Sequence, residues 1–230
     1  DWQLMKAAPE VEAIEAEAMD REPDDPLLNT VPGLQLYLST RDPENNTRYY
    51  RWEFVETYEI TDSPMEFGVD PKTCYISKTV GINDIQVLNA NEVNADRLDD
   101  YNFFKRNVIY TIAQGYYMTV YQKSLSKTAY EYWDHVAQSL IRTGNMFESP
   151  VGKIRSNMVN VNNLDEEIFG FFYATAQDTV RVYVSPELAG SPNIHCPPNV
   201  PPPPGGGCPV LVCCDCLDEE GSSLVKPEWW

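Results

Sequence analysis

Two stretches of alternating side chains constrain the fold of this chain more than any other feature. The first carries a leucine at every second position, and we call Leu34, Leu36 and Leu38 the leucine stripe. The second carries aromatic rings on one parity, and we call Tyr50, Trp52, Phe54 and Tyr58 the aromatic stripe. A period of two places each stripe on one face of a strand. Because the turn at 42–46 separates them, we predict a hairpin.

The aromatic stripe has two interpretations. On an exposed face it would form a platform for stacking sugar rings, whereas on a buried face it would form core. Since a leucine stripe with the same period lies next to it in the chain, we predict that it is core. With 230 residues, of which 43% are hydrophobic, the chain has enough apolar side chains for a packed core.

Further strands are predicted along the rest of the chain. Short strands are expected at 74–77 and 85–88, followed by a long β-rich run at 108–121 that should break near Gly115. Segments 167–174 and 179–184 are predicted to form a second hairpin about 177–178. Its buried residues would be Val180, Val182 and Val184.

One helix is predicted near 127–143. Thr128 and Glu131 have the spacing of a capping box, and Gly144-Asn145 supplies a stop signal. The apolar face would carry Ala129, Trp133, Val136 and Leu140. His135 falls on the opposite face, so we interpret it as a surface residue.

The predicted fold class is mainly β (α+β): an antiparallel β-sandwich or curled sheet with one packed helix and a disulfide-bearing carboxy-terminal tail. We assign 30–188 to the β domain and 189–230 to a tail rich in proline, glycine and cysteine. The chain opens at Asp1-Trp2-Gln3 without a signal peptide. We therefore expect 1–29 to be an acidic segment that connects to a missing upstream domain. Whether 9–20 is helical stays open, because its alanines and glutamates favour helix but the segment is short.

Cysteine usage indicates the compartment. Five of the six cysteines lie in the tail, beside the spacer at 201–207, where no separate core can form. We predict disulfides in an oxidising compartment, with the pairing open, among Cys74, Cys196, Cys208, Cys213, Cys214 and Cys216. The alternative is a zinc site, because Cys213 and Cys216 have C-x-x-C spacing with His195 or Cys196 nearby. Only one such pair is present.

Charge and hydropathy exclude several classes of partner. The chain has 35 acidic and 17 basic residues, a formal net charge of −18, which opposes binding to nucleic acid. No apolar run is long enough to span a bilayer as a helix.

No residue set indicates catalysis, a cofactor or a metal. The chain has two histidines and lacks G-x-S-x-G, H-E-x-x-H, P-loop and G-x-G-x-x-G motifs. Glu53, Glu56 and Glu59 could contribute to a carboxylate pair, but we predict a solvated strand face. The acidic residues at 215–220 lack the spacing of a calcium loop. The terminal Trp229 and Trp230 are expected to dock onto the domain or onto a partner, which makes them partner-docking candidates.

The order of several motifs resembles one family. The motifs are GLQLYL (33–38), TRYYRWE (47–53), CYIS (74–77), VYQKSLS (120–126), AYEYW (129–133), GNMFE (144–148), NVNN (160–163), GFF (170–172), CCDC (213–216) and KPEW (226–229). In this order they are similar to domain-of-unknown-function family 4249, over residues 30 to 230.

The resemblance implies a lipoprotein on the surface of the bacterial outer membrane, held by a lipid anchor upstream of this chain. It implies a non-catalytic accessory to a TonB-dependent transporter, with a role in nutrient capture or gating, or a structural or adhesive component among other envelope proteins. An enzyme such as a carboxylate-pair glycan hydrolase is the third hypothesis. The resemblance also makes Thr179 a glycosylation candidate, within Asp178-Thr179-Val180.

Overall fold

The computed structural model describes residues 5, 7–21, 31–42, 47–64, 68–80, 85–93, 97–142, 154, 156–198, 208 and 210–230. Three predicted features fall outside these residues: most of the turn at 42–46, the stop at 144–145 and the spacer at 201–207.

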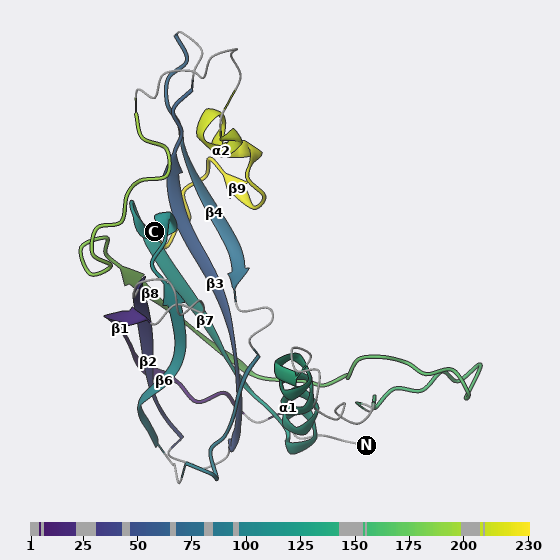
Figure 1. Cartoon of the computed structure of the whole chain (residues 1–230). Coiled ribbons are helices and arrows are strands. Elements are labelled where there is room, and N and C mark those ends of the chain that lie inside the picture. The colour runs from purple at the N-terminus through teal and green to yellow at the C-terminus, as the bar shows by residue number, and fades with distance from the viewer. Residues whose placement is uncertain are drawn as a thin grey trace.

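Two antiparallel sheets form the body (Figure 1). The three-stranded sheet has the order β1 (Val11–Arg21), β2 (Val31–Arg41) and β6 (Arg97–Asn107). The larger sheet has the order β8 (Gln177–Val184), β7 (Tyr116–Ser124), β3 (Tyr49–Thr61), β4 (Thr73–Val80) and β9 (Ser222–Ser223). A further strand, β5 (Gln86–Asn89), also pairs with β3. This arrangement confirms the predicted fold class.

The core lies between the sheets and contains both stripes. The leucine stripe is at most 3% exposed, and so is the aromatic stripe, so the prediction that the rings are core is confirmed. Across the interface, the ring of Phe54 lies 4.5 Å from that of Phe104, and the ring of Trp52 lies 5.5 Å from that of Tyr101. Aromatic rings at such distances add to the free energy gained by burial.

The predicted first hairpin is wrong. β2 pairs with β1 and β6, whereas β3 pairs with β4, β5 and β7, so the two stripes belong to different sheets. A hairpin would have put both stripes on the same face of one sheet, which would then need a separate cover. In the sandwich, the sheet with the leucine stripe covers the sheet with the aromatic stripe.

Residues 7–21 belong to the sandwich, which corrects the prediction of a connecting segment for this part of 1–29. Residues Val11–Arg21 form β1 and pair along β2. The carbonyl oxygen of Pro9 accepts a hydrogen bond from Gln122 Nε2 (2.8 Å), and that of Ala7 accepts one from Thr47 Oγ1 (2.9 Å). Pairing with β2 thus overrides the helix preference of alanine and glutamate, which settles the question left open for 9–20.

The second predicted hairpin is also wrong, although one of its strands exists. β8 pairs with β7, and residues 167–174 form no strand. Val184 is buried and Val180 and Val182 are half-buried, as their spacing predicts. The run at 108–121 does break: a short 3₁₀ helix, η1 (Tyr110–Ile112), precedes Gly115, and β7 starts after it.

Strand β6 was missed because its pattern is irregular. Its register against β2 shifts at two places, and Asp100 has a positive φ of 48°. Such irregularities move side chains off the period of two.

The predicted helix is confirmed as α1 (Lys127–Arg142). Its start differs from the prediction, because Ser126 Oγ accepts the hydrogen bond from the Ala129 N–H (3.3 Å). The cap is therefore two residues earlier than the capping box suggested. His135 is exposed, as predicted.

All six cysteines form disulfides, which excludes the zinc alternative for these sulfurs. The pairs are Cys74–Cys216, Cys196–Cys213 and Cys208–Cys214. Two short helices carry the last cysteines, α2 (Leu211–Cys214) and η2 (Cys216–Asp218). The buried carboxylate of Asp62 accepts hydrogen bonds from the backbone N–H of Lys72 (2.8 Å) and of Cys216 (3.3 Å). It therefore links the tail to the end of β3.

The terminal tryptophans dock onto the larger sheet. The ring of Trp230 lies 5.2 Å from that of Tyr75 and 5.0 Å from that of Tyr117. The ring of Trp229 lies 5.3 Å from that of Tyr117, and the guanidinium of Arg181 lies 4.6 Å from it. Trp229 keeps 37% of its surface exposed. Contact of either residue with a partner stays a prediction.

Candidate functional site

A long arm, residues 156–172, projects from the sandwich beside α1 (Figure 1). It carries large apolar side chains that are almost fully exposed: Val159 (71%), Val161 (82%), Leu164 (81%), Phe169 (84%) and Phe172 (74%). Single exposed apolar residues are common on proteins, but a group of five on one projection is typical of an interaction surface.

Side-chain hydrogen bonds order the arm, although it has no helix or strand. The amide of Asn157 donates to the carbonyl oxygen of Phe172 (2.6 Å) and accepts from its N–H (2.8 Å), so it joins the two ends of the arm. Farther out, Asn160 donates to Glu166 Oε2 (2.7 Å) and accepts from the Asn162 N–H (2.9 Å). Asparagine favours such local turns.

A group of aromatic rings and one guanidinium, which we call the anchor, attaches the arm to the sandwich: Arg51, Tyr132, Trp133, Phe171 and Tyr173. The ring of Phe171 stacks on that of Tyr132 at 4.9 Å. The guanidinium of Arg51 lies 3.6 Å from the centre of the Trp133 ring and donates to the Tyr173 hydroxyl (3.0 Å). The anchor therefore connects β3, α1 and the arm.

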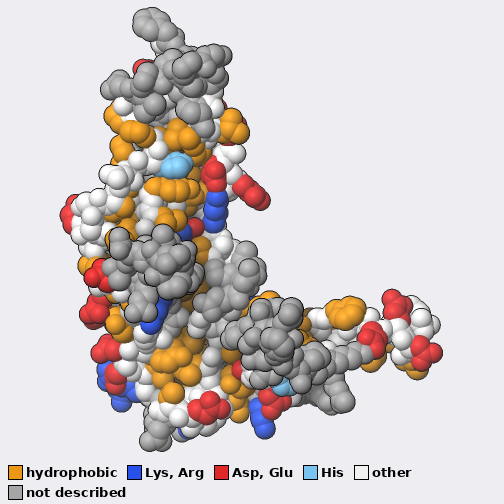
Figure 2. All heavy atoms as spheres, in the orientation of Figure 1, with side chains coloured by type: hydrophobic (Ala, Val, Ile, Leu, Met, Phe, Trp, Pro, Cys, Tyr) orange, Lys and Arg blue, Asp and Glu red, His pale blue; other side chains and the backbone are white. Residues whose placement is uncertain are grey.

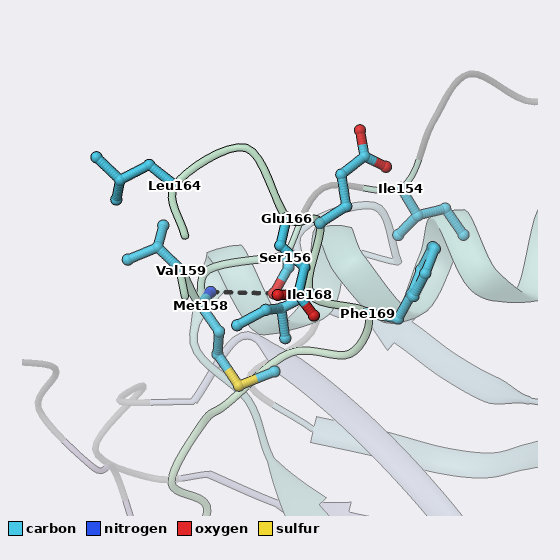
Figure 3. Close-up of a pocket in the computed structure, with 9 residues that line it drawn as sticks. Ile154, Ser156, Met158, Val159, Leu164, Glu166, Ile168 and Phe169 are labelled. Atoms are coloured by element: carbon cyan, nitrogen blue, oxygen red, sulfur yellow. Dashed lines mark hydrogen bonds between the residues drawn. The ribbon is translucent and has the colours of Figure 1, made fainter. Parts of the chain in front are cut away.

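A shallow pocket of about 220 Å³ lies within the arm (Figure 3). Val159 and Leu164 lie at one end of it, and Ile154 and Phe169 lie at the other. Its polar groups are few; Ser156 Oγ accepts a hydrogen bond from the Met158 N–H (3.0 Å). An apolar lining with two exposed glutamates, Glu166 and Glu167, suits contact with apolar groups better than acid–base chemistry.

The charges on the arm have one sign. Asp165, Glu166 and Glu167 are all exposed, and the sequence 156–172 contains no lysine or arginine. The acidic groups are visible beside apolar side chains near the far end of the arm in Figure 2.

Two of the three glutamates considered for a carboxylate pair, Glu53 and Glu56, form ion pairs. Glu53 forms ion pairs with Arg51 (2.8 Å) and with Lys123 (2.5 Å). Glu56 is buried and pairs with Arg106, so the prediction of a solvated position is wrong for this residue. Residue 56 is even-numbered like the residues of the aromatic stripe, and this was the sequence signal that its side chain faces the core.

A family model described as "Domain of unknown function (DUF4249)" matches residues 2–181. The chain belongs to the DUF4249 family. In this DUF4249 chain the matched residues include the arm and strands β1 to β7, and the match ends before the cysteine tail. No curated protein and no solved structure matches the chain.

Other features of this DUF4249 chain bear on function less directly. Among the residues described, no helix is long and apolar enough to cross a membrane. The same residues contain no group of three or more His, Cys, Asp or Glu that could hold a metal ion. Thr179 is exposed on β8, and its N–H donates to Asp178 Oδ1 (2.9 Å). Its glycosylation stays a prediction.

Proposed function

We propose that this chain is a non-catalytic, cell-surface accessory to an outer-membrane TonB-dependent transporter, and that it contacts its partner through the arm. The observation that carries the proposal is the group of five apolar side chains on the arm, each at least 71% exposed. Burying such side chains against a partner would release about 25 cal/mol per Å² of apolar surface. A contact role explains why they are exposed.

Two further observations support the proposal. Three disulfides suit an oxidising compartment such as the periplasm or the cell surface. The net charge of −18 suits a partner with basic loops. Attachment to the membrane would come from a lipid anchor upstream of residue 1.

A pull-down from solubilised outer membranes tests the proposal. The native, lipidated protein should recover a barrel protein of the TonB-dependent class, and the variant Leu164→Ser/Phe169→Ser should recover at least tenfold less. The matched control is Val69→Ser, which changes an apolar residue that is 46% exposed between β3 and β4. Failure of the unsubstituted protein to recover any barrel protein would refute the proposal.

A second candidate is a structural or adhesive component of an outer-membrane assembly that binds no small molecule. The arm pocket is shallow, which suits contact with a protein surface better than enclosure of a small molecule. A thermal-shift screen of small nutrients separates an accessory that captures a nutrient from a structural component that binds none. A ligand that raises the unfolding temperature supports nutrient capture, and the absence of any such ligand supports the structural role.

A further inference from the structure

We infer that the outer face of the larger sheet, which is turned away from the core, binds a neutral saccharide. The site, which we call the ring site, consists of Glu59 on β3, Tyr117 on β7, Arg181 and Tyr183 on β8, and Trp229. Tyr117 lies directly opposite Tyr183 across the two strands, and their rings are 5.1 Å apart. The ring of Trp229 lies 5.3 Å from that of Tyr117. The inference goes beyond the contact role of the arm and does not depend on it.

The rings of the ring site are accessible to a ligand. Tyr183 is 48% exposed and Trp229 is 37% exposed. The ring plane of Tyr117 is inclined by 50° to that of Tyr183 and by 78° to that of Trp229. Tilted rings cover less of one another's faces than parallel stacked rings do, so aromatic surface stays open for another molecule.

Trp229 is held in place before a ligand binds. The next residue, Trp230, fills the space above Gly115, where a Cβ would lie 2.6 Å from its ring. The Trp230 N–H donates to the carbonyl oxygen of Pro227 (3.1 Å), which closes a turn around Trp229. A side chain that is already fixed loses less conformational entropy on binding.

Polar side chains of the ring site can both donate and accept hydrogen bonds. The Arg181 guanidinium is exposed and lies 4.6 Å from the Trp229 ring, and the Glu59 carboxyl carbon lies 3.4 Å from where a Cβ on residue 115 would be. Neither side chain forms an ion pair or a side-chain hydrogen bond with another described residue. Arginine only donates, and an ionised glutamate only accepts. A sugar matches this set, because its C–H face stacks on a ring and its hydroxyl groups donate and accept.

Charge favours a neutral ligand. Arg181 already occupies the cation position beside the Trp229 ring, so a second cation there would meet a like charge. An anion would meet the Glu59 carboxylate and the net charge of −18 on the chain. Both charged side chains also oppose burial of this face in lipid hydrocarbon. A neutral saccharide can bond to both groups without either conflict.

Isothermal titration of the full, native protein with oligosaccharides tests the inference. The probes are neutral oligosaccharides of glucose, xylose, mannose, galactose or N-acetylglucosamine, each at up to about 10 mM. We expect saturable binding of at least one probe. Trp229→Ala and Tyr183→Ala should each weaken its affinity at least tenfold, whereas Trp229→Phe, which keeps a ring, should change it less than about threefold.

A polar variant supplies the second readout. Arg181→Met removes the donors and keeps an apolar stem beside Trp229, so the affinity should fall about threefold to tenfold. The matched control is Arg97→Met, on an exposed arginine of β6 in the other sheet, which should not change the affinity. Val93→Ala, at a residue that is 44% exposed after β5, is the control for removal of an exposed apolar side chain.

Several outcomes would overturn the inference. They are no binding by any probe, binding that both Trp229→Ala and Tyr183→Ala leave unchanged, and an equal loss in the two arginine variants. A synthetic proline-rich peptide belongs in the titration because polyproline helices also dock onto aromatic side chains. If this peptide alone binds, and Trp229→Ala abolishes its binding, the ring site is a peptide site and the inference fails.

The outcomes are also distinguishable from those of the proposed function. Arg51 of the anchor and Glu59 of the ring site lie near opposite ends of β3, so each surface can be changed separately. If a saccharide binds at the ring site but the pull-down recovers no barrel protein, the inference stands and the transporter role fails. If a barrel protein is recovered but no saccharide binds, the reverse holds.

Discussion

Glu56 and Arg106 form an ion pair between the two sheets of the sandwich. Glu56 lies on β3 and Arg106 on β6, and their side chains are 6% and 16% exposed. Arg106 also donates to the hydroxyl of Tyr116 on β7 (3.1 Å), and burial raises the pKa of Tyr116. Charges removed from water need such partners, since an unpaired charge at this position would be strongly unfavourable.

Removing one residue of this ion pair should therefore lower the free energy of unfolding more than removing both. We expect Arg106→Met to lower the free energy of unfolding by about 3–5 kcal/mol, because Glu56 would stay buried without its partner. The double variant Glu56→Leu/Arg106→Met should recover most of this loss. Urea unfolding at neutral pH measures both values. If the double variant lost as much free energy of unfolding as Arg106→Met and Glu56→Leu lose together, the interpretation would be contradicted.

Gly115 is required by the position of Trp230. A Cβ at residue 115 would lie 2.6 Å from Trp230 Cζ2, so Gly115→Ala should displace the terminal ring from Tyr75 and Tyr117. We expect a loss of about 1–3 kcal/mol and a changed near-UV circular dichroism spectrum. In a Trp230→Ala background the same substitution should have little effect. An equal cost in both backgrounds would show that the two residues are not coupled.

Tyr50 should make stability depend on pH in the alkaline range. Burial, reinforced by the charge of Asp42, raises its pKa to about 12 from the ordinary value of 10.0. The protonated phenol is favoured in the folded state, so this contribution is complete below about pH 10 and is lost as pH rises toward 12. Tyr50 by itself should contribute a fall of about 1.4 kcal/mol per pH unit to the free energy of unfolding in this window. Urea unfolding from pH 8 to 12 checks this, and Tyr50→Phe should reduce the slope.

At the scale of elements, the arm was the part least accessible to sequence reasoning. The aromatic residues at 169–173 resemble a buried strand, but they divide between exposure and the anchor. Asparagines at 160–163 and Gly170, which has a φ of +100°, were the available signals of an irregular segment. Which ring is exposed depends on Tyr132 and Trp133 of α1, about 40 residues earlier in the chain, and local patterns carry no such information.

Two neighbouring phenylalanines of the arm should differ in their effect on stability. Phe171 stacks on Tyr132, so Phe171→Ala should lower the free energy of unfolding by about 1–2 kcal/mol. Phe169 is 84% exposed, so Phe169→Ala should change it by less than about 0.5 kcal/mol. Thermal or urea unfolding compares them. Equal effects would mean that Phe169 is also packed.

At the scale of the whole molecule, the disulfide Cys74–Cys216 joins the tail to the sandwich, and the other two lie within the tail. Cys74–Cys216 connects residues 142 positions apart and is fully buried, whereas Cys208–Cys214 connects residues 6 positions apart. The longer loop restricts the unfolded chain much more. The free energy of unfolding should therefore depend more on Cys74–Cys216 than on Cys208–Cys214.

Removing the two bridges separately tests this difference. Chain entropy alone predicts a loss of about 5 kcal/mol for Cys74→Ala/Cys216→Ala and about 2 kcal/mol for Cys208→Ala/Cys214→Ala. Denaturant unfolding without reductant gives both values. Equal losses would show that native packing, and not loop length, determines the contribution of each bridge.

The sequence by itself determined the local features of this protein: the two stripes, the helix near 127–143, the break before Gly115 and the oxidised state of the cysteines. These follow from side-chain period, turn residues and composition, which act between near neighbours. Tertiary structure alone decided which strands pair, that β1 is a strand, that Glu56 faces Arg106 and how the cysteines combine. It also decided that the arm stays uncovered. The physical reason is that burial and pairing depend on residues distant in sequence, and a local pattern is compatible with more than one such set of partners.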